Sequence, residues 1–253
     1  MDLQEYRVSE AERERTNDIV RLIPADGTTA LDVGARDGHF SKLLAKSYTN
    51  VTALDLEKPC IDAPNVTCTA GDVTNLVFDN SVFDVVLCAE VLEHINPEHL
   101  ATACSELSRV TKSYLLIGVP YMQDTRIGRT TCLSCGRHNP PWGHVNTFSE
   151  DSLIALFPDL QPESVSLVGQ TTAHTNTLST LLMDLAANPY GTYDQEELCI
   201  YCDSKLIPPR TRGPARRLAA KLGFIARRAT APFAKPHAKW IHVLFSKSHQ
   251  SEA

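Results

Sequence analysis

Residues 30–38 read Ala-Leu-Asp-Val-Gly-Ala-Arg-Asp-Gly, and this segment restricts the fold of the chain more than any other. An apolar run ends at Val33, and Gly34 follows directly. Gly38 comes next and precedes a helical pattern at 40–45. A strand that turns straight into a helix needs glycine where the backbone takes a positive φ or lies against a ligand. The first turn of such a helix has unpaired N–H groups that can bind a polar ligand. The segment therefore predicts a strand, a tight turn and a helix, with a ligand at the turn.

Three further apolar runs lead into acidic residues. They are 51–54 before Asp55, 66–70 before Asp72, and 83–89 before Glu90. Another apolar run at 114–120 follows a helical segment at 97–109. Short β-rich runs that alternate with helical patterns are typical of βαβ units and a parallel sheet. Ligands of such sheets bind beyond the carboxyl ends of the strands, so the acids and Gly34 are expected at one edge.

The remaining elements follow from capping residues and apolar spacing. A helix is expected at about 10–23, beginning near Ser9, and another after Ser149. Residues 120–146 are rich in Cys, Gly and Pro and predict an irregular insertion. The other expected elements are a strand near 163–168, an apolar helix at 176–187 and a last strand at about 197–201.

This order of motifs resembles the class I S-adenosylmethionine-dependent methyltransferases. The similar branch has an Asp-Val-Gly-x-x-x-Gly first motif and a Glu-Val-Leu-Glu-His fourth motif, and the resemblance covers residues 10–168. It implies an α/β fold: a Rossmann-like, mostly parallel seven-stranded sheet with helices on both faces, plus a Cys-rich insertion. It also implies S-adenosylmethionine as cofactor and methyl transfer as activity. The alternative, a Rossmann-type dehydrogenase, would need Gly-x-Gly-x-x-Gly at the turn, which this sequence lacks.

The resemblance assigns cofactor binding to a set of residues: Asp32, Gly34, Ala35, Arg36, Gly38, Asp55, Leu56, Asp72, Val73 and Ala89. In the family the glycine turn packs against the amino acid part of the cofactor. The acid at Asp55 would hold both ribose hydroxyls, since a carboxylate is a double acceptor. Asp72 would accept from the adenine amino group, and the backbone N–H of Val73 would donate to the ring. Arg36 stands where the family usually has a third glycine. It predicts either a slightly displaced loop or a pairing of Arg36 with the methionine carboxylate.

Two Cys-x-x-Cys segments indicate a metal site, formed by Cys132 with Cys135 and by Cys199 with Cys202. A two-residue spacer lets both thiolates face one cation, and two such pairs supply a closed tetrahedral zinc site. The 63 residues between the pairs exceed the spacing of a zinc ribbon. The alternatives are four unrelated cysteines or one redox-active pair, although a thioredoxin-like pair should begin a helix. A four-cysteine zinc would have no open position, so it would stabilise the fold rather than catalyse.

The candidate catalytic residues are Glu90, Glu93, His94 and His144. In one interpretation His94 or His144 accepts or orients a hydroxyl proton, a role that suits a neutral imidazole. In the other, all four residues bind a divalent cation that lowers the hydroxyl pKa. That pattern resembles the metal sets of small-RNA 3′-end 2′-O-methyltransferases and of some ubiquinone-pathway O-methyltransferases. A third interpretation is structural, since Glu-Val-Leu-Glu-His is also a cofactor-side motif of many family members.

The net charge of −6 is divided unevenly along the chain. From residue 204 onward there are eleven basic residues and one acid, Glu252, so this part has a charge of +10 and the remainder −16. The asymmetry predicts a boundary near residue 207. It separates the domain that resembles a methyltransferase, at 1–206 with the insertion at 120–146, from a basic tail at 207–253. Within the tail, Leu218, Leu222 and Ile225 fall on one helical stripe. Arginines 216, 217, 227 and 228 fall on the other side.

Such a tail suits several partners. It could lie on an anionic membrane surface or hold RNA phosphates. It could also dock onto the acidic body, or stay solvated. The N-terminus has neither the basic patch nor the apolar core of a signal peptide, so a cytoplasmic protein is expected, peripheral at the membrane if the tail binds lipid. The acceptor expected is an oxygen of a small molecule, sugar or lipid-linked glycan. The alternatives are ribose 2′-O-methylation of RNA and a non-catalytic S-adenosylmethionine-binding scaffold.

Overall fold

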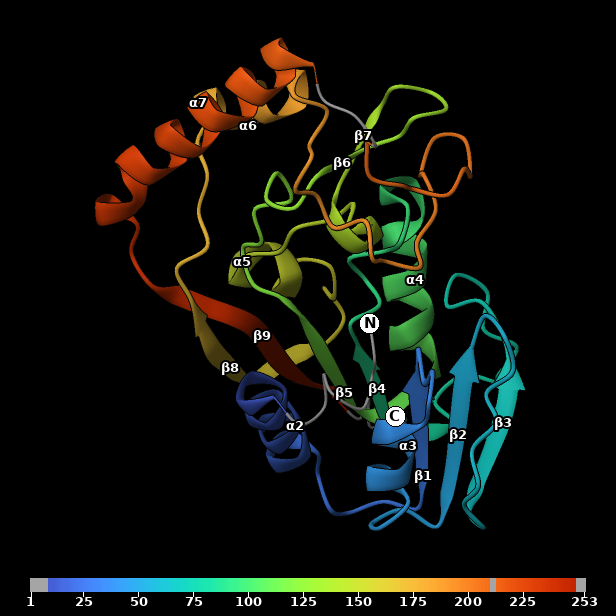
Figure 1. The fold of residues 1–253 in the computed structure, drawn as a ribbon. Helices are drawn as coiled ribbons and strands as arrows, with labels where there is room; N and C mark the ends of the chain where they lie inside the picture. The colour runs from blue at the N-terminus through green and yellow to red at the C-terminus, as the bar shows by residue number, and fades with distance from the viewer. Residues whose placement is uncertain (1–8, 210–212, 249–253) are drawn as a thin grey trace. The chain divides into compact units, whose positions relative to one another are not determined.

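The structure is a computed structural model that describes residues 9–209 and 213–248. Seven strands form one sheet in the order β3-β2-β1-β4-β5-β9-β8 (Figure 1). In chain order they are β1 (Thr29–Val33), β2 (Asn50–Asp55), β3 (Val66–Ala70), β4 (Phe83–Ala89), β5 (Thr111–Pro120), β8 (Gln161–Thr171) and β9 (His237–Ser246). The helices are α2 (Glu10–Leu22), α3 (His39–Leu44), α4 (Pro97–Val110), α5 (Glu150–Ile154), α6 (Thr177–Leu185) and α7 (Pro214–Thr230).

The sheet is parallel through its first five strands, since β3, β2, β1, β4 and β5 pair in parallel register. Strand β9 then pairs antiparallel with β5, from Tyr114 opposite Ser246 to Pro120 opposite Trp240. The predicted fold class, a mostly parallel seven-stranded α/β sheet, is therefore confirmed.

Helices cover both faces of the sheet because successive strand residues point to opposite sides. On one side, Leu31, Val86 and Leu115 pack in a cluster that includes residues of α4 and α5. On the other side, the neighbouring residues Ala30, Val85 and Leu116 pack in a cluster that includes residues of α2 and α3. Near-continuous apolar runs are expected of strands that are buried on both faces.

The helix starts agree with their predicted caps. The Ser9 hydroxyl accepts from the backbone N–H of Glu12, and α2 begins at Glu10. The Ser149 hydroxyl accepts from the backbone N–H of Ser152, and α5 begins at Glu150. These bonds satisfy N–H groups that the first helical turn leaves without intrahelical partners.

The described chain divides into two compact units. One contains the sheet and comprises residues 9–121, 148–169 and 238–248. The other comprises Met122–Thr147 and the described part of Gln170–His237. It holds α6, α7, a short hairpin of β6 (Thr130–Thr131) and β7 (His138–Asn139), and the 3-10 turns Pro141–Gly143 and Ala231–Phe233. No helix in residues 9–209 or 213–248 is long and apolar enough to span a membrane.

Two expectations for the C-terminal part need correction. The strand predicted at 197–201 is wrong, because those residues form loop and turn around the second cysteine pair. The last strand of the sheet is instead β9, which lies within the segment predicted as a separate tail. The segment 207–253 therefore differs from the expectation, since it supplies a buried strand with Ile241 and Val243 fully enclosed. The stripe predicted within it lies on helix α7, which has 17 residues.

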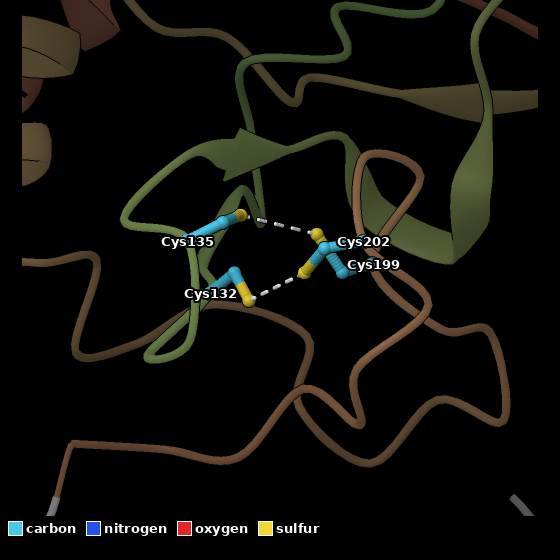
Figure 2. A group of neighbouring side chains, drawn as sticks. All are labelled: Cys132, Cys135, Cys199 and Cys202. Atoms are coloured by element: carbon cyan, nitrogen blue, oxygen red, sulfur yellow. Dashed lines mark hydrogen bonds between the residues drawn. The ribbon is translucent and has the colours of Figure 1, made fainter.

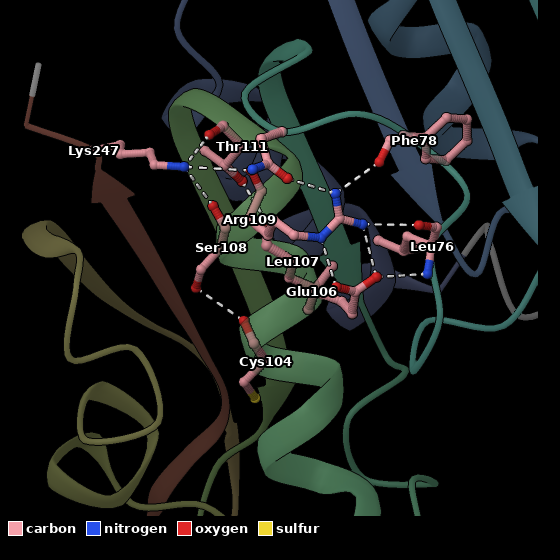
Figure 3. Close-up of polar contacts among 10 residues, drawn as sticks. Leu76, Phe78, Cys104, Glu106, Leu107, Ser108, Arg109, Thr111 and Lys247 are labelled. Atoms are coloured by element: carbon pink, nitrogen blue, oxygen red, sulfur yellow. Dashed lines mark hydrogen bonds and ion pairs between the residues drawn. The ribbon is translucent and has the colours of Figure 1, made fainter.

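The end of β9 is held to the end of α4 by Lys247 (Figure 3). Its ammonium donates to the carbonyl oxygens of Ser108 and Thr111, each at 2.8 Å. Ser108 lies in the last turn of α4, and Thr111 follows the helix directly. Carbonyls at a helix C-terminus have no intrahelical partner and carry partial negative charge, so a lysine there is stabilising.

We predict that Lys247→Met will lower the free energy of unfolding by about 1–2 kcal/mol, because the helix-end carbonyls lose charged donors. Urea denaturation followed by circular dichroism measures the change. The matched control is Lys46→Met, which removes an exposed lysine in the turn after α3. Equal stabilities for the two variants would contradict the capping role.

Candidate active site and cysteine cluster

The glycine turn after β1 has the backbone that the sequence predicted. Gly34 and Gly38 both have φ of 77°. A Cβ added at Gly34 would lie 2.4 Å from a methyl carbon of Val91, and one added at Gly38 would lie 2.5 Å from Ile61. Both positions therefore require glycine for conformation and for space. Gly38 is the N-cap of α3 and supplies no side-chain hydrogen bond to the first turn of the helix.

Arg36 departs from the family pattern in sequence but not in backbone conformation. Its φ of 44° lies in the left-handed region that glycine favours. Its backbone N–H donates to Oδ2 of Asp55 at 2.8 Å, which fixes the turn against the end of β2. The loop is thus closed onto Asp55, with the Arg36 side chain exposed at its surface.

Asp55 ends β2 with its carboxylate at the carboxyl edge of the sheet. Besides Arg36, the backbone N–H of Leu56 donates to it, at 2.7 Å to Oδ1. Each carboxylate oxygen accepts one of these bonds and keeps a further lone pair for a ligand hydroxyl. The next side chain, Leu56, is 75% exposed and forms an apolar surface beside this acceptor.

Asp72 and Val73 lie in a loop that α4 holds in place. Oδ1 of Asp72 accepts from the backbone N–H and the hydroxyl of Thr74, both at 2.8 Å. Val73 is buried. Further along the loop, two residues of α4 hold the backbone of Leu76 (Figure 3). The Arg109 guanidinium donates to the Leu76 carbonyl, and the Leu76 N–H donates to the Glu106 carboxylate, both at 2.8 Å. The position of the Asp72 loop therefore depends on a helix that is distant in sequence.

Asp32 is buried within the sheet unit. Its Oδ2 accepts from the hydroxyl of Ser41 at 2.5 Å, which joins β1 to α3. Burial raises the pKa of Asp32 to about 6, although the bonds from Ser41 oppose the rise. The bond therefore holds β1 and α3 together on either side of the glycine turn. Direct contact of Asp32 with a cofactor stays a prediction.

The segment after β4 brings Ala89, Glu90, Glu93 and His94 to the same edge of the sheet. Glu90 has φ of 58°, a strained conformation for a residue with a side chain. Among the described residues, neither oxygen of the fully buried Glu93 carboxylate has a hydrogen-bond partner. Burial and the neighbouring charge of Glu90 raise the pKa of Glu93 well above its ordinary value of 4.5. Desolvation by the surrounding protein lowers the pKa of His94, and the Arg36 charge lowers it further. Both effects favour the neutral imidazole.

The sequence did not reveal Arg15, the cation that faces these acids. It is 5% exposed on α2, forms two hydrogen bonds with Glu12 at 2.7 and 2.8 Å, and lies 3.9 Å from Glu90. Its guanidinium also lies over the rings of Phe40 and Trp240. The sequence held one indication, the helical spacing. Positions 12, 15, 19 and 22 share one face of α2, and that face is buried.

His144 lies in the other unit, in the segment Met122–Thr147. It is buried, and its Nδ1 is 2.6 Å from Oε1 of Gln123. That contact fixes the orientation of the ring and makes Nδ1 the protonated nitrogen, because the amide oxygen can only accept. Its catalytic role stays a prediction.

The four cysteines of the two Cys-x-x-Cys segments converge within one unit (Figure 2). The sulfur atoms all lie within 4.8 Å of one another. Cys132 is 3.7 Å from Cys202, and Cys135 is 3.7 Å from Cys199, measured between sulfur atoms. No disulfide joins them, and a disulfide would require about 2 Å.

The two hairpins are built alike. The N–H of Gly136 donates to the carbonyl of Cys132, and the N–H of Asp203 donates to that of Cys199, both at 2.9 Å. In each hairpin the residue after the second cysteine has positive φ, 73° at Gly136 and 54° at Asp203. Two matched hairpins that direct four sulfurs to one point form a candidate metal centre, as the sequence predicted.

A family model described as a methyltransferase domain matches residues 31–116, from β1 to β5. This segment carries the glycine turn and the acids Asp55, Asp72 and Glu90. Within residues 31–116 the chain is therefore a methyltransferase domain, as the motifs predicted.

Two curated relatives match parts of the chain. The ubiquinone biosynthesis O-methyltransferase of Coxiella burnetii is 29% identical over 128 residues, covering 41% of this chain and 55% of that protein. The malonyl-(acyl-carrier protein) O-methyltransferase of Pectobacterium atrosepticum is 32% identical over 112 residues, covering 42% and 44%. The chain thus spans about half the length of these relatives.

A solved structure of a SAM dependent methyltransferase from Archaeoglobus fulgidus has a TM-score of 0.56 to this chain and covers 96% of it, and 97% of that protein. Its sequence is 14% identical to this chain, so the likeness concerns the fold.

We predict that Asp32→Asn will change how stability depends on pH. In the folded protein the pKa of Asp32 is about 6, above its ordinary value of 3.8. The stability contributed by the protonated carboxyl is therefore fully present below pH 3.8 and is lost as the pH rises through 6. Relative to the wild type, the variant should therefore gain about 3 kcal/mol of stability between pH 4 and 7. Urea titrations at a series of pH values measure this gain.

The matched control for this prediction is Asp26→Asn, an exposed acid that precedes β1. Its stability curve should stay parallel to that of the wild type. If the Asp32→Asn curve is also parallel, Asp32 has no raised pKa in the folded protein.

Proposed function

We propose that the protein is an S-adenosylmethionine-dependent methyltransferase that methylates an oxygen of a small molecule, a sugar or a lipid-linked glycan. The observation that carries the proposal is the arrangement of Asp55 and the Asp72 loop on neighbouring strands beside the Gly34–Gly38 turn. Oxygen as the acceptor atom is supported by the two curated relatives, both of which are O-methyltransferases by name.

The residues at this edge fit the cofactor part by part. The glycine turn lets the backbone bend sharply between β1 and α3 at the carboxyl edge, which suits close approach of the methionine part. The free lone pairs of Asp55 match two adjacent ribose hydroxyls, and exposed Leu56 supplies apolar surface for the adenine. The Asp72 carboxylate and the Val73 N–H match the adenine edge.

When bound, the cofactor would supply a sulfonium-activated methyl group. The protein therefore needs no strong nucleophile of its own, and catalysis comes mainly from holding the acceptor oxygen in line with that methyl group. A base must take up the hydroxyl proton. His94 is our candidate because its imidazole lies at this edge of the sheet and is neutral, although its lowered pKa makes it a weaker base than an ordinary histidine. His144 is the second candidate for this role.

A divalent cation at Glu90, Glu93, His94 and His144 is the second proposal for the same residues. It is supported by the buried carboxylate of Glu93, which lacks a hydrogen-bond partner among the described residues. Carboxylate oxygen and imidazole nitrogen are suitable ligands for such an ion, which would lower the hydroxyl pKa.

We also propose that Cys132, Cys135, Cys199 and Cys202 hold one structural zinc ion. A Zn–S bond is about 2.3 Å long, so two sulfurs of a tetrahedral site lie about 3.8 Å apart. Sulfur pairs of this structure are separated by 3.7 Å. Four protein ligands leave no open position, so the ion would join the 122–147 segment to the 199–202 hairpin and would not take part in methyl transfer.

The cofactor assignment predicts that Asp55→Ala will weaken S-adenosylhomocysteine binding at least about tenfold, because charged hydrogen bonds to two hydroxyls are lost. Isothermal titration calorimetry measures the affinity. The control is Asp26→Ala, which removes an exposed acid at the opposite end of the sheet. Unchanged affinity in Asp55→Ala would refute the assignment of the ribose acceptor.

The acceptor class can be found with S-adenosylmethionine carrying a labelled methyl group. The wild type is incubated with cell extract, and label is measured in small-molecule, glycan, lipid and RNA fractions. Label in the first three supports the proposal. Label in RNA would favour the ribose alternative, and no label despite cofactor binding would favour a non-catalytic scaffold.

The zinc assignment predicts about one zinc per chain and its loss in Cys199→Ser. Elemental analysis of purified protein measures the metal. Cys60→Ser is the matched control, because Cys60 is an exposed cysteine outside the cluster, and it should keep the ion. The Cys199→Ser change should lower thermal stability before it lowers S-adenosylhomocysteine affinity. Metal-free wild-type protein with four freely reactive thiols in the cluster would contradict the assignment.

A further inference from the structure

Helices α6 and α7 pack against each other through small residues. A Cβ at Gly223 would lie 3.1–3.4 Å from Met183 and Leu182 of α6, and the Ser179 hydroxyl donates to the Gly223 carbonyl at 2.9 Å. Ala220, one turn earlier, is also buried. The close contact buries one side of α7, so the opposite side of the helix faces away from α6.

The side of α7 that faces away from α6 is apolar. Leu218, Leu222 and Ile225 recur at intervals of four and three residues, so they form one stripe along the helix. They are 58%, 43% and 56% exposed. Helix α6 repeats the pattern with three leucines that are also more than half exposed: Leu178, Leu181 and Leu185. An exposed stripe of aliphatic side chains along a helix often marks an interaction site.

Cations lie beside the α7 stripe. Arg217 and Lys221 each precede a stripe residue by one position, and Arg228 continues their row. Helix α7 contains five basic residues and no acid. In the described part of the chain the side chains of Arg217, Lys221 and Arg228 form no ion pair.

A groove of about 1130 Å³ runs along this row of cations. Its lining includes Arg217, Lys221 and Arg228 together with the aromatic side chains of Tyr190 and Phe224. Positive charge at the rim and apolar surface beside it match an anionic headgroup next to hydrocarbon. We call the surface formed by the α7 stripe and this groove the basic–apolar face.

We propose that the basic–apolar face docks on an anionic phospholipid bilayer. An interfacial helix places its apolar stripe at the boundary of headgroups and acyl chains, while flanking Lys and Arg contact anionic headgroups. Both parts are present on α7. RNA binding would use the cations but would give no reason for the three exposed aliphatic residues of the α7 stripe, since phosphate contacts are electrostatic. The proposal does not depend on methyl transfer and concerns only where the protein binds.

The test uses the full chain and sedimentation with two kinds of vesicle, phosphatidylcholine alone and phosphatidylcholine mixed with phosphatidylglycerol. The wild type should bind the mixed vesicles and bind the neutral ones much more weakly. Replacing the stripe by serine, in Leu218→Ser, Leu222→Ser and Ile225→Ser combined, should reduce binding at least about tenfold. Replacing the cations, in Arg217→Gln, Lys221→Gln and Arg228→Gln combined, should reduce it about fivefold per charge.

Two matched controls separate the face from general hydrophobicity and charge. The first replaces three exposed aliphatic residues of the sheet unit by serine: Val77, Val82 and Leu167. The second replaces three exposed cations of that unit by glutamine: Arg13, Lys42 and Lys46. Both controls should bind mixed vesicles as the wild type does. Circular dichroism melting and S-adenosylhomocysteine titration confirm that every variant is folded.

Several outcomes would overturn the proposal. One is a wild type that sediments with neither vesicle, and another is equal binding to neutral and anionic vesicles. A control that loses binding as much as its matched variant also contradicts it. Binding of polyuridylic acid that falls steeply with salt and is unchanged by the serine variant, without vesicle binding, would assign the face to RNA. None of these results depends on whether the protein transfers a methyl group.

Discussion

The antiparallel pairing of β9 with β5 is the constraint on which the rest of the sheet depends. Strands β1 to β5 pair in parallel as the chain proceeds, and this leaves the far edge of β5 without a partner. Strand β9 fills that position from the end of the chain, with Ile241, Val243 and Phe245 fully buried. An unpaired strand edge exposes backbone groups and apolar side chains, so the sheet is complete only when 237–246 has been placed.

The same strand also organises the polar interior around the site. His242 of β9 is fully buried and lies 2.6 Å from Asp18 of α2. Burial alone would raise the pKa of Asp18, but hydrogen bonds from His242, Arg21 and Ser166 lower it to about 2. Trp240 lies beside Arg15, the cation that faces Glu90. The charges behind the carboxyl edge are therefore balanced by residues from α2 and β9.

The elements that could be predicted from sequence are those whose signals are local. The strands at 29–33, 66–70 and 83–89 are apolar runs with turns at both ends, and the structure has them at these residues. The capped helices after Ser9 and Ser149 are of the same kind. The glycine turn and the acids were placed correctly because the carboxyl ends of parallel strands meet at one edge. The clustering of four cysteines followed from the geometry of two short hairpins.

The errors arose where distant parts of the chain decide the conformation. Residues 197–201 have an apolar pattern, but the second cysteine hairpin sets their backbone, and Leu198, Ile200 and Tyr201 are 42–50% exposed. Strand β9 was not predicted, because the positive charge of the C-terminal segment indicated a separate tail and its apolar run was not recognised as a strand. Arg15 was not singled out from the sequence because a charged helix residue is usually exposed, and its burial follows from distant partners such as Glu90 and Trp240.

The glycine turn and the acids at the carboxyl edge of this sheet favour S-adenosylmethionine over a dinucleotide as the ligand. The most direct measurement is calorimetric titration of the wild-type chain with S-adenosylhomocysteine and, separately, with NAD. The arrangement of the glycine turn, Asp55 and the Asp72 loop predicts saturable binding of one S-adenosylhomocysteine per chain and no comparable binding of NAD. Binding of NAD without binding of S-adenosylhomocysteine would contradict the account.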